Sequence, residues 1–137
     1  MADDFSELYQ LAADLEDAPD NLPPFLAKAI GQTSKRVKDD AQKSVRSRDK
    51  RLSHAASAID YELTGTSGAV SGISSEIGYD KGKSGGPLGT WIEYGAPNAG
   101  NHIAPSHDLG NALMNNEDDL VKGVTAAVDD AMREAGL

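Results

Sequence analysis

The chain has 137 residues, of which 39% are hydrophobic and only 5% aromatic, a composition that fits a single domain with a modest core. The absence of cysteine excludes a disulfide framework and a thiolate metal site. Neither a basic, apolar leader nor an apolar run of about 20 residues is present, so we expect no membrane partner and a protein made and assembled in a cytoplasm.

The formal net charge of −9 is unevenly distributed along the chain. Residues 1–20 hold seven acidic residues and no basic one, whereas residues 35–51 hold eight of the thirteen basic residues. The last 37 residues are again mainly acidic. This segregation favours stacking of subunits in which a basic face meets an acidic one. A solvated helix face would give the same charge run, and both interpretations stay open.

Two helices are predicted before the first strand. Apolar residues at helical spacing predict a short acidic helix over residues 4–17, a peripheral arm within the first 20 residues that ends near Pro19. Two prolines then open a second helix over residues 23–46, with an apolar stripe at Leu26, Ile30, Thr33, Val37, Ala41 and Val45. Gly31 weakens this helix by about 1 kcal/mol relative to alanine, which close contact with another backbone would explain. Residues 46–58 are polar and indicate a loop with room for one helical turn.

The period then changes from helical to alternating. Ile59, Tyr61 and Leu63 alternate with polar residues, which predicts a half-buried strand that ends at the Gly65–Gly68 turn. A second strand is expected over residues 69–79.

A glycine-rich segment separates the second strand from a predicted third one. Residues 80–87 hold no side chain suited to packing, so they are interpreted as a mobile loop. A third strand is predicted over Leu88 to Tyr94, containing the sole tryptophan, Trp91, and an irregular segment follows from Gly95 to Pro105.

The C-terminal part predicts one long helix over residues 107–134, capped by Ser106 and interrupted near Asn115-Asn116. Leu109 and Leu113 are expected to pack back against the sheet. The element order predicts an α+β fold of residues 1–137, with long N-terminal helices, a small antiparallel sheet with a long hairpin loop, and a C-terminal helix packed on the sheet.

No pattern in the sequence indicates catalysis, a cofactor or a metal site. Gly82-Lys83-Ser84 matches the end of a phosphate-binding loop, but Ile77 stands where the leading glycine is required. His54, His102 and His107 lack the spacing of a metal pair and the neighbours of a nucleophile. We therefore expect a protein that is not an enzyme and in which no histidine is catalytic.

The basic segment 35–51 also allows a nucleic-acid hypothesis, because phosphate neutralisation needs only clustered lysine and arginine. Asp39, Asp40 and Asp49 interrupt the segment, and no aromatic residue is interleaved with it. A DNA- or protein-binding regulator therefore stays as an alternative.

One strand–loop–helix pattern resembles the small head–tail joining, or tail-completion, proteins of long-tailed bacteriophages, also called minor tail or neck proteins. Members of that family combine an aliphatic-Glu-aromatic-Gly turn with a Pro-rich loop and a Pro-x-x-x-Leu-x-x-Ala-Leu helix start. In this chain the pattern falls on Ile92, Glu93, Tyr94 and Gly95, then on Pro105, Leu109, Ala112 and Leu113. The resemblance covers residues 22–135.

The resemblance implies a structural virion protein in a ring at the head–tail interface, assembled in the host cytoplasm. Its partners would be copies of itself, in six-fold symmetry, and neighbouring connector and tail proteins, with DNA passing an acidic lumen without specific binding. A tail-terminator ring of the same particle is the related alternative. The basic residues expected at subunit interfaces are Arg46, Arg48, Lys50, Arg51, Lys81 and Lys83.

Overall fold

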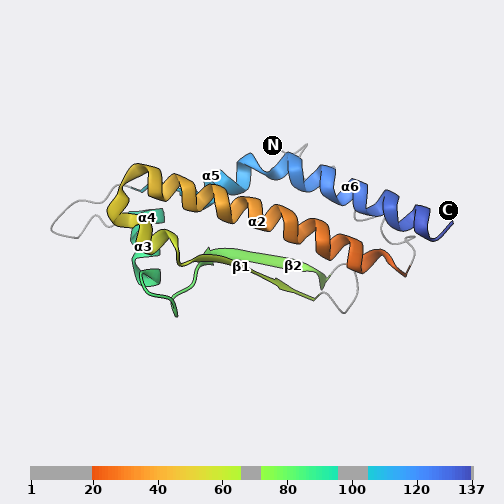
Figure 1. Cartoon of the computed structure of the whole chain (residues 1–137), viewed down its shortest axis with the longest axis horizontal. Helices are drawn as coiled ribbons and strands as arrows, with labels where there is room; N and C mark the ends of the chain where they lie inside the picture. Colours follow the sequence, from red (N-terminus) through yellow and green to blue (C-terminus); the bar gives the residue numbers. More distant parts are fainter. Residues whose placement is uncertain (1–19, 66–71, 96–104, 137) are drawn as a thin grey trace. The chain divides into compact units, whose positions relative to one another are not determined.

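The computed structural model describes residues 20–65, 72–95 and 105–136 (Figure 1). In chain order, its elements are the helix α2 (Leu22–Arg48), the 3-10 helix η1 (Lys50–Leu52), α3 (Ser53–Ala56), the strands β1 (Ile59–Thr64) and β2 (Ser74–Tyr79), the 3-10 helix η3 (Gly86–Leu88), and the helices α4 (Gly89–Tyr94), α5 (Asp108–Asn115) and α6 (Glu117–Glu134). The two strands pair in an antiparallel sheet, so the fold is α+β, as predicted. The predicted helix over residues 4–17 lies outside the described residues.

The chain divides into two compact units, each built from segments that are distant in the sequence. The described part of unit 1 comprises residues 20–33, 63–75 with its gap, and 118–136, and unit 2 comprises Ser34–Glu62 and Glu76–Glu117. Each unit has its own cluster of buried apolar side chains.

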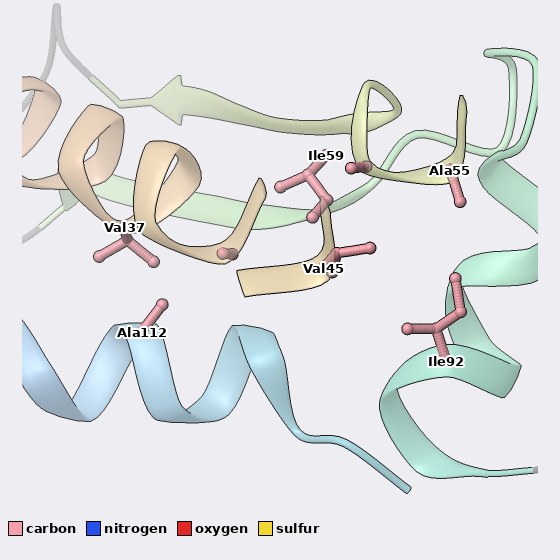
Figure 2. Packing of buried hydrophobic residues seen from close by; sticks show 8 residues of the cluster. Val37, Val45, Ala55, Ile59, Ile92 and Ala112 are labelled. Carbon is pink, nitrogen blue, oxygen red and sulfur yellow. The ribbon is translucent and has the colours of Figure 1, made fainter. Parts of the chain in front are cut away.

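The core of unit 2 is built on the C-terminal half of α2. Val37, Ala41 and Val45 recur every four residues and are buried, which confirms the predicted apolar stripe in this half of the helix. Figure 2 shows Ala112 of α5 pointing toward Val37 of α2. The other buried members of the cluster come from α3, β1 and α4: Ala55, Ala56, Ile59 and Ile92.

The core of unit 1 pairs the N-terminal part of α2 with α6. Leu22, Leu26 and Ala29 of α2 form one buried cluster with Val124, Ala127 and Ala131 of α6. The close contact expected at Gly31 is with a side chain and not with another backbone. A Cβ at this position would lie 3.2 Å from Leu63 Cδ1. Within the described ranges, no helix is long and apolar enough to cross a membrane.

The predicted interruption of the C-terminal helix is confirmed at Asn116, which separates α5 from α6. The buried side-chain amide of Asn116 donates hydrogen bonds to Asp40 Oδ2, at 2.9 Å, and to the Ala112 carbonyl oxygen, at 2.7 Å. A side chain that competes for a helix carbonyl in this way favours a break over a continuous helix. Leu113 is 53% exposed, so the expectation that it packs back against the sheet is wrong.

One loop prediction requires correction, and the bounds of a second are refined. The predicted loop over residues 46–58 contains the end of α2 and two short helices, η1 and α3. Residues 80–85 form a loop, as predicted, whereas Gly86 is buried and begins η3, and its amide donates to the Lys83 carbonyl oxygen at 3.0 Å. The Lys83 amide in turn bonds the Asp80 carbonyl oxygen at 3.0 Å, so this segment is a series of turns.

The second predicted strand is shorter than expected, because β2 begins at Ser74 and the described residues Gly72 and Ile73 precede it. The third predicted strand is wrong, because residues 88–94 complete η3 and form α4. In α4 the buried residues are Gly89, Ile92 and Glu93, which follow a helical period and not the alternation of a strand.

Candidate functional site

The residues of the family-like pattern meet at the corner between α4 and α5, in unit 2. Two glycines shape the first half of this corner. A Cβ at Gly89 would lie 2.0 Å from the Tyr79 ring, so only glycine allows α4 to start against β2. Gly95 ends α4 with a φ of +83°, a conformation that other residues adopt at a cost.

Glu93 connects the two helices of the corner. Its side chain is almost fully buried, and its two oxygens accept hydrogen bonds from the backbone amides of Leu109, at 2.8 Å, and Gly110, at 3.2 Å. These amides belong to the first turn of α5, where amides lack partners within the helix. A carboxylate in this position also interacts favourably with the helix dipole. Glu93 therefore caps α5 from a different element.

This contact corrects the expectation that Ser106 caps the C-terminal helix. The residue before α5 is His107, whose side chain forms no capping bond and whose φ is +53°. Ser106 Oγ lies 2.6 Å from both the Ile92 carbonyl oxygen and Asp108 Oδ2. The Ser106 amide donates to the Ile92 carbonyl oxygen at 3.2 Å, so Ser106 joins α4 to the start of α5.

A second buried carboxylate, Asp108, lies beside this cap. It accepts hydrogen bonds from Ser44 Oγ, at 2.6 Å, and from the Arg48 guanidinium, both on α2. Burial raises the pKa of Asp108, but the hydrogen bonds from Ser106, Ser44 and Arg48 outweigh burial and lower this pKa below its usual value. The ion pair fastens α5 to the C-terminal half of α2.

The family-like residues are not all alike in their environment. Ile92 and Ala112 are buried in the core of unit 2, and Leu109 is partly buried against it. Pro105, Tyr94 and Leu113 are exposed, and the Tyr94 ring meets the His107 ring edge-on at 6.4 Å. The corner thus combines structural residues with an exposed apolar surface.

The six basic residues expected at interfaces divide into two groups. Arg48, Arg51 and Lys83 form ion pairs within the chain, with Asp108, Asp49 and Asp60 respectively. Arg46 donates a hydrogen bond to Ser57 Oγ at 3.2 Å, and Lys50 and Lys81 are exposed. Only the second group leaves its charge without an acidic partner among the contacts of the described residues.

Lys83 binds Asp60 at 2.8 Å, and Lys38 approaches the same carboxylate at 3.4 Å. The hydrogen bond from Lys83, followed by that from the Tyr61 amide, lowers the pKa of Asp60 to about 2. Nearby, Ser84 Oγ lies 2.6 Å from His54 Nε2. The Gly82-Lys83-Ser84 segment is therefore engaged with its own unit.

Tyr79, against which Gly89 packs, has a buried hydroxyl group. This hydroxyl has no hydrogen-bond partner among the described residues. Burial, followed by the negative charges of Asp108 and Glu93, raises the pKa of Tyr79 to about 12. The phenol therefore stays neutral across the physiological pH range.

Sequence reasoning missed the roles of Glu93 and Asp108, because buried carboxylates are uncommon and their partners lie far away in the sequence. The pattern around residues 92–95 did draw attention to Glu93, but as part of a strand. Within the described ranges, no three His, Cys, Asp or Glu residues are grouped so as to hold a metal ion. Comparison of the chain with protein-family models, curated proteins and solved structures gives no match.

Proposed function

We propose that this chain is a structural subunit of a long-tailed bacteriophage, in a ring at the head–tail interface that completes the tail or joins it to the head. Its partners in this proposal are copies of itself, in six-fold symmetry, and the adjoining connector and tail proteins. DNA passes the lumen of the ring without specific binding. The protein has no catalytic role in this proposal.

The observation that carries the proposal is the capping of α5 by the carboxylate of Glu93. The family-like pattern is a spaced set of residues, and such a set arises easily by chance. Here its two halves, at residues 92–95 and 105–113, join in one hydrogen-bonded corner. That joining supports the interpretation of the pattern as a unit, although its first half is the helix α4 and not the strand that the resemblance implies.

The charge distribution gives further support. Unit 2 contains ten acidic and ten basic residues, whereas the described part of unit 1 contains six acidic residues against three basic ones. A ring that passes DNA benefits from acidic surface, because like charge prevents the polymer from adhering to the wall.

Electron microscopy of purified particles tests the proposal directly. We expect density for several copies of this chain, arranged around the tail axis next to the connector. Particles assembled without the chain should have heads and tails that fail to join, or tails of abnormal length. Infectious particles that lack the chain would contradict the proposal.

A DNA-binding regulator that uses residues 35–51 is disfavoured by one observation. Lys38, Arg48 and Arg51 are already paired with Asp60, Asp108 and Asp49, which reduces the charge available to phosphates. A salt-dependent affinity of the isolated monomer or dimer for DNA would nevertheless favour the regulator over the ring.

A further inference from the structure

Three large apolar side chains of η3 and α4 are exposed. Leu88, Trp91 and Tyr94 follow one another at intervals of three residues, so their side chains are neighbours on one helical surface. They are 45%, 50% and 69% exposed. Three large apolar side chains exposed in one row are uncommon on a monomer of this size and typify a protein–protein contact. We call these three residues the apolar stripe.

A groove in unit 1 has the complementary character. It has a volume of about 410 Å³ and lies between the N-terminal part of α2 and α6. Phe25 and Ala29 line it from α2, and Gly123 and Ala126 line it from α6, where the small residues leave the space open. Lys28 and Asp130 place one charge of each sign beside it. We call this feature the α2–α6 groove.

We propose that the apolar stripe of one subunit inserts into the α2–α6 groove of a second copy of this chain. The inference rests on the proposed ring and names the surfaces that build it. Pockets of about 300–1,000 Å³ accommodate drug-sized ligands, so this groove has room for one or two aromatic side chains. Aromatic anchors of this kind dominate the binding energy of most interfaces.

The charges of the two units favour a second copy in head-to-tail orientation. A two-fold contact of unit 1 with unit 1 would bring together two surfaces that each have an excess of acidic residues. A contact between unit 1 of one copy and unit 2 of the next instead places acidic α6 residues opposite the unit that contains the basic segment 35–51. Contacts between two different surfaces generate closed rings when the rotation closes.

The experiment uses the full chain and its single tryptophan. Wild-type protein is followed by sedimentation and by Trp91 fluorescence through a dilution series, and we expect the emission to shift to shorter wavelength as subunits associate. Trp91→Ala removes the centre of the apolar stripe and should weaken association about 30-fold, as for a hot-spot residue.

Ala126→Tyr fills the groove from an exposed position and should weaken association to a similar extent. The control Thr125→Tyr, at the adjacent exposed position outside the groove, should associate like wild type. Circular dichroism confirms that each variant is folded, and Gln32→Tyr repeats the block from the α2 side of the groove.

A mixture of the two variants Trp91→Ala and Ala126→Tyr provides the decisive test. A Trp91→Ala subunit retains its groove and an Ala126→Tyr subunit retains its stripe, so the mixture should form pairs but no larger assemblies. Wild-type protein that remains monomeric at all concentrations would overturn the inference, as would Ala126→Tyr and Gln32→Tyr subunits that assemble normally. Those outcomes leave the proposed function standing if the chain is still found in particles. Absence of the chain from particles instead contradicts the function, whatever its behaviour in solution.

Discussion

Glu93 shows how a single buried side chain stabilises the corner between α4 and α5. Its two oxygens bond two amides that have no partner inside α5, and the residue that precedes the helix has no capping side chain. The sequence identified Glu93 through a family-like pattern, but spacing alone could not predict that its carboxylate is buried. The deciding partners lie sixteen and seventeen residues further along the chain.

Replacing Glu93 by alanine should therefore lower the free energy of unfolding by about 2–3 kcal/mol, because two helix-start amides lose their acceptors in a buried place. Glu93→Gln keeps one oxygen acceptor and should cost less. Urea denaturation monitored by circular dichroism measures both effects. Glu62→Ala, which removes an exposed carboxylate from β1, serves as the control. Equal stability of all three variants would contradict the capping role.

Lys83→Gln should raise the pKa of Asp60 from about 2 toward its ordinary value, because the hydrogen bond from Lys83 is the largest cause of the lowered pKa. The direction of the effect on stability follows from proton linkage. A carboxyl with a lowered pKa in the folded state stabilises the fold above its unfolded-state pKa, and this contribution is lost as the pH falls toward 2. Carboxyl NMR across an acid titration measures the shift. In the control variant Lys81→Gln, the pKa of Asp60 should stay as in wild type. A raised pKa of Asp60 in Lys81→Gln but not in Lys83→Gln would refute the assignment to Lys83.

At the scale of elements, periodicity predicted well wherever one face of a regular element is buried. The 27-residue helix α2, the alternating β1 and the interruption near Asn116 all follow from local patterns. Residues 88–94 were mispredicted because tryptophan, isoleucine and tyrosine favour strands in general. Their helical structure depends on contacts with Tyr79 and with α5, which no local pattern encodes.

Gly89→Ala tests that dependence. In an ordinary helix this substitution stabilises by about 1 kcal/mol. Here the new methyl group would lie 2.0 Å from the Tyr79 ring, so we expect a net destabilisation of about 1–3 kcal/mol. Thermal unfolding provides the measurement. Gly78→Ala, where the added methyl group meets no atom within 4 Å, is the matched control. A more stable Gly89→Ala protein would show that α4 does not pack closely on β2.

For the whole molecule, the basic segment offers a test of assembly that spares the fold. The exposed residues Arg46 and Lys50 form no ion pair among the described contacts, so Arg46→Glu combined with Lys50→Glu should leave the monomer folded. If these charges face acidic surface on a neighbour, the double variant should assemble poorly in sedimentation and yield few infectious particles. Normal particles from this variant would contradict the role of the segment in assembly.

Arg48 must be excluded from that test and treated separately. Arg48→Glu would place a second carboxylate beside the buried Asp108, so we expect a loss of about 3 kcal/mol or more in the free energy of unfolding. Chemical denaturation of the monomer measures this loss, and Lys43→Glu, at an exposed position of the same helix, is the control. An Arg48→Glu protein as stable as wild type would show that the ion pair has no structural role.

The interleaved course of the chain through its two units has a consequence for folding during synthesis. The core of unit 1 requires Val124, Ala127 and Ala131, which are synthesised long after their partners Leu22, Leu26 and Ala29 of α2. Unit 2 likewise requires Ala112, which follows the end of α2 by more than sixty residues, so the core around α2 stays incomplete until α5 has been synthesised. Long waits of this kind expose nascent chains to aggregation. Ribosome-bound chains that end before α5 should therefore recruit chaperones, and chains that extend beyond α6 should recruit them less.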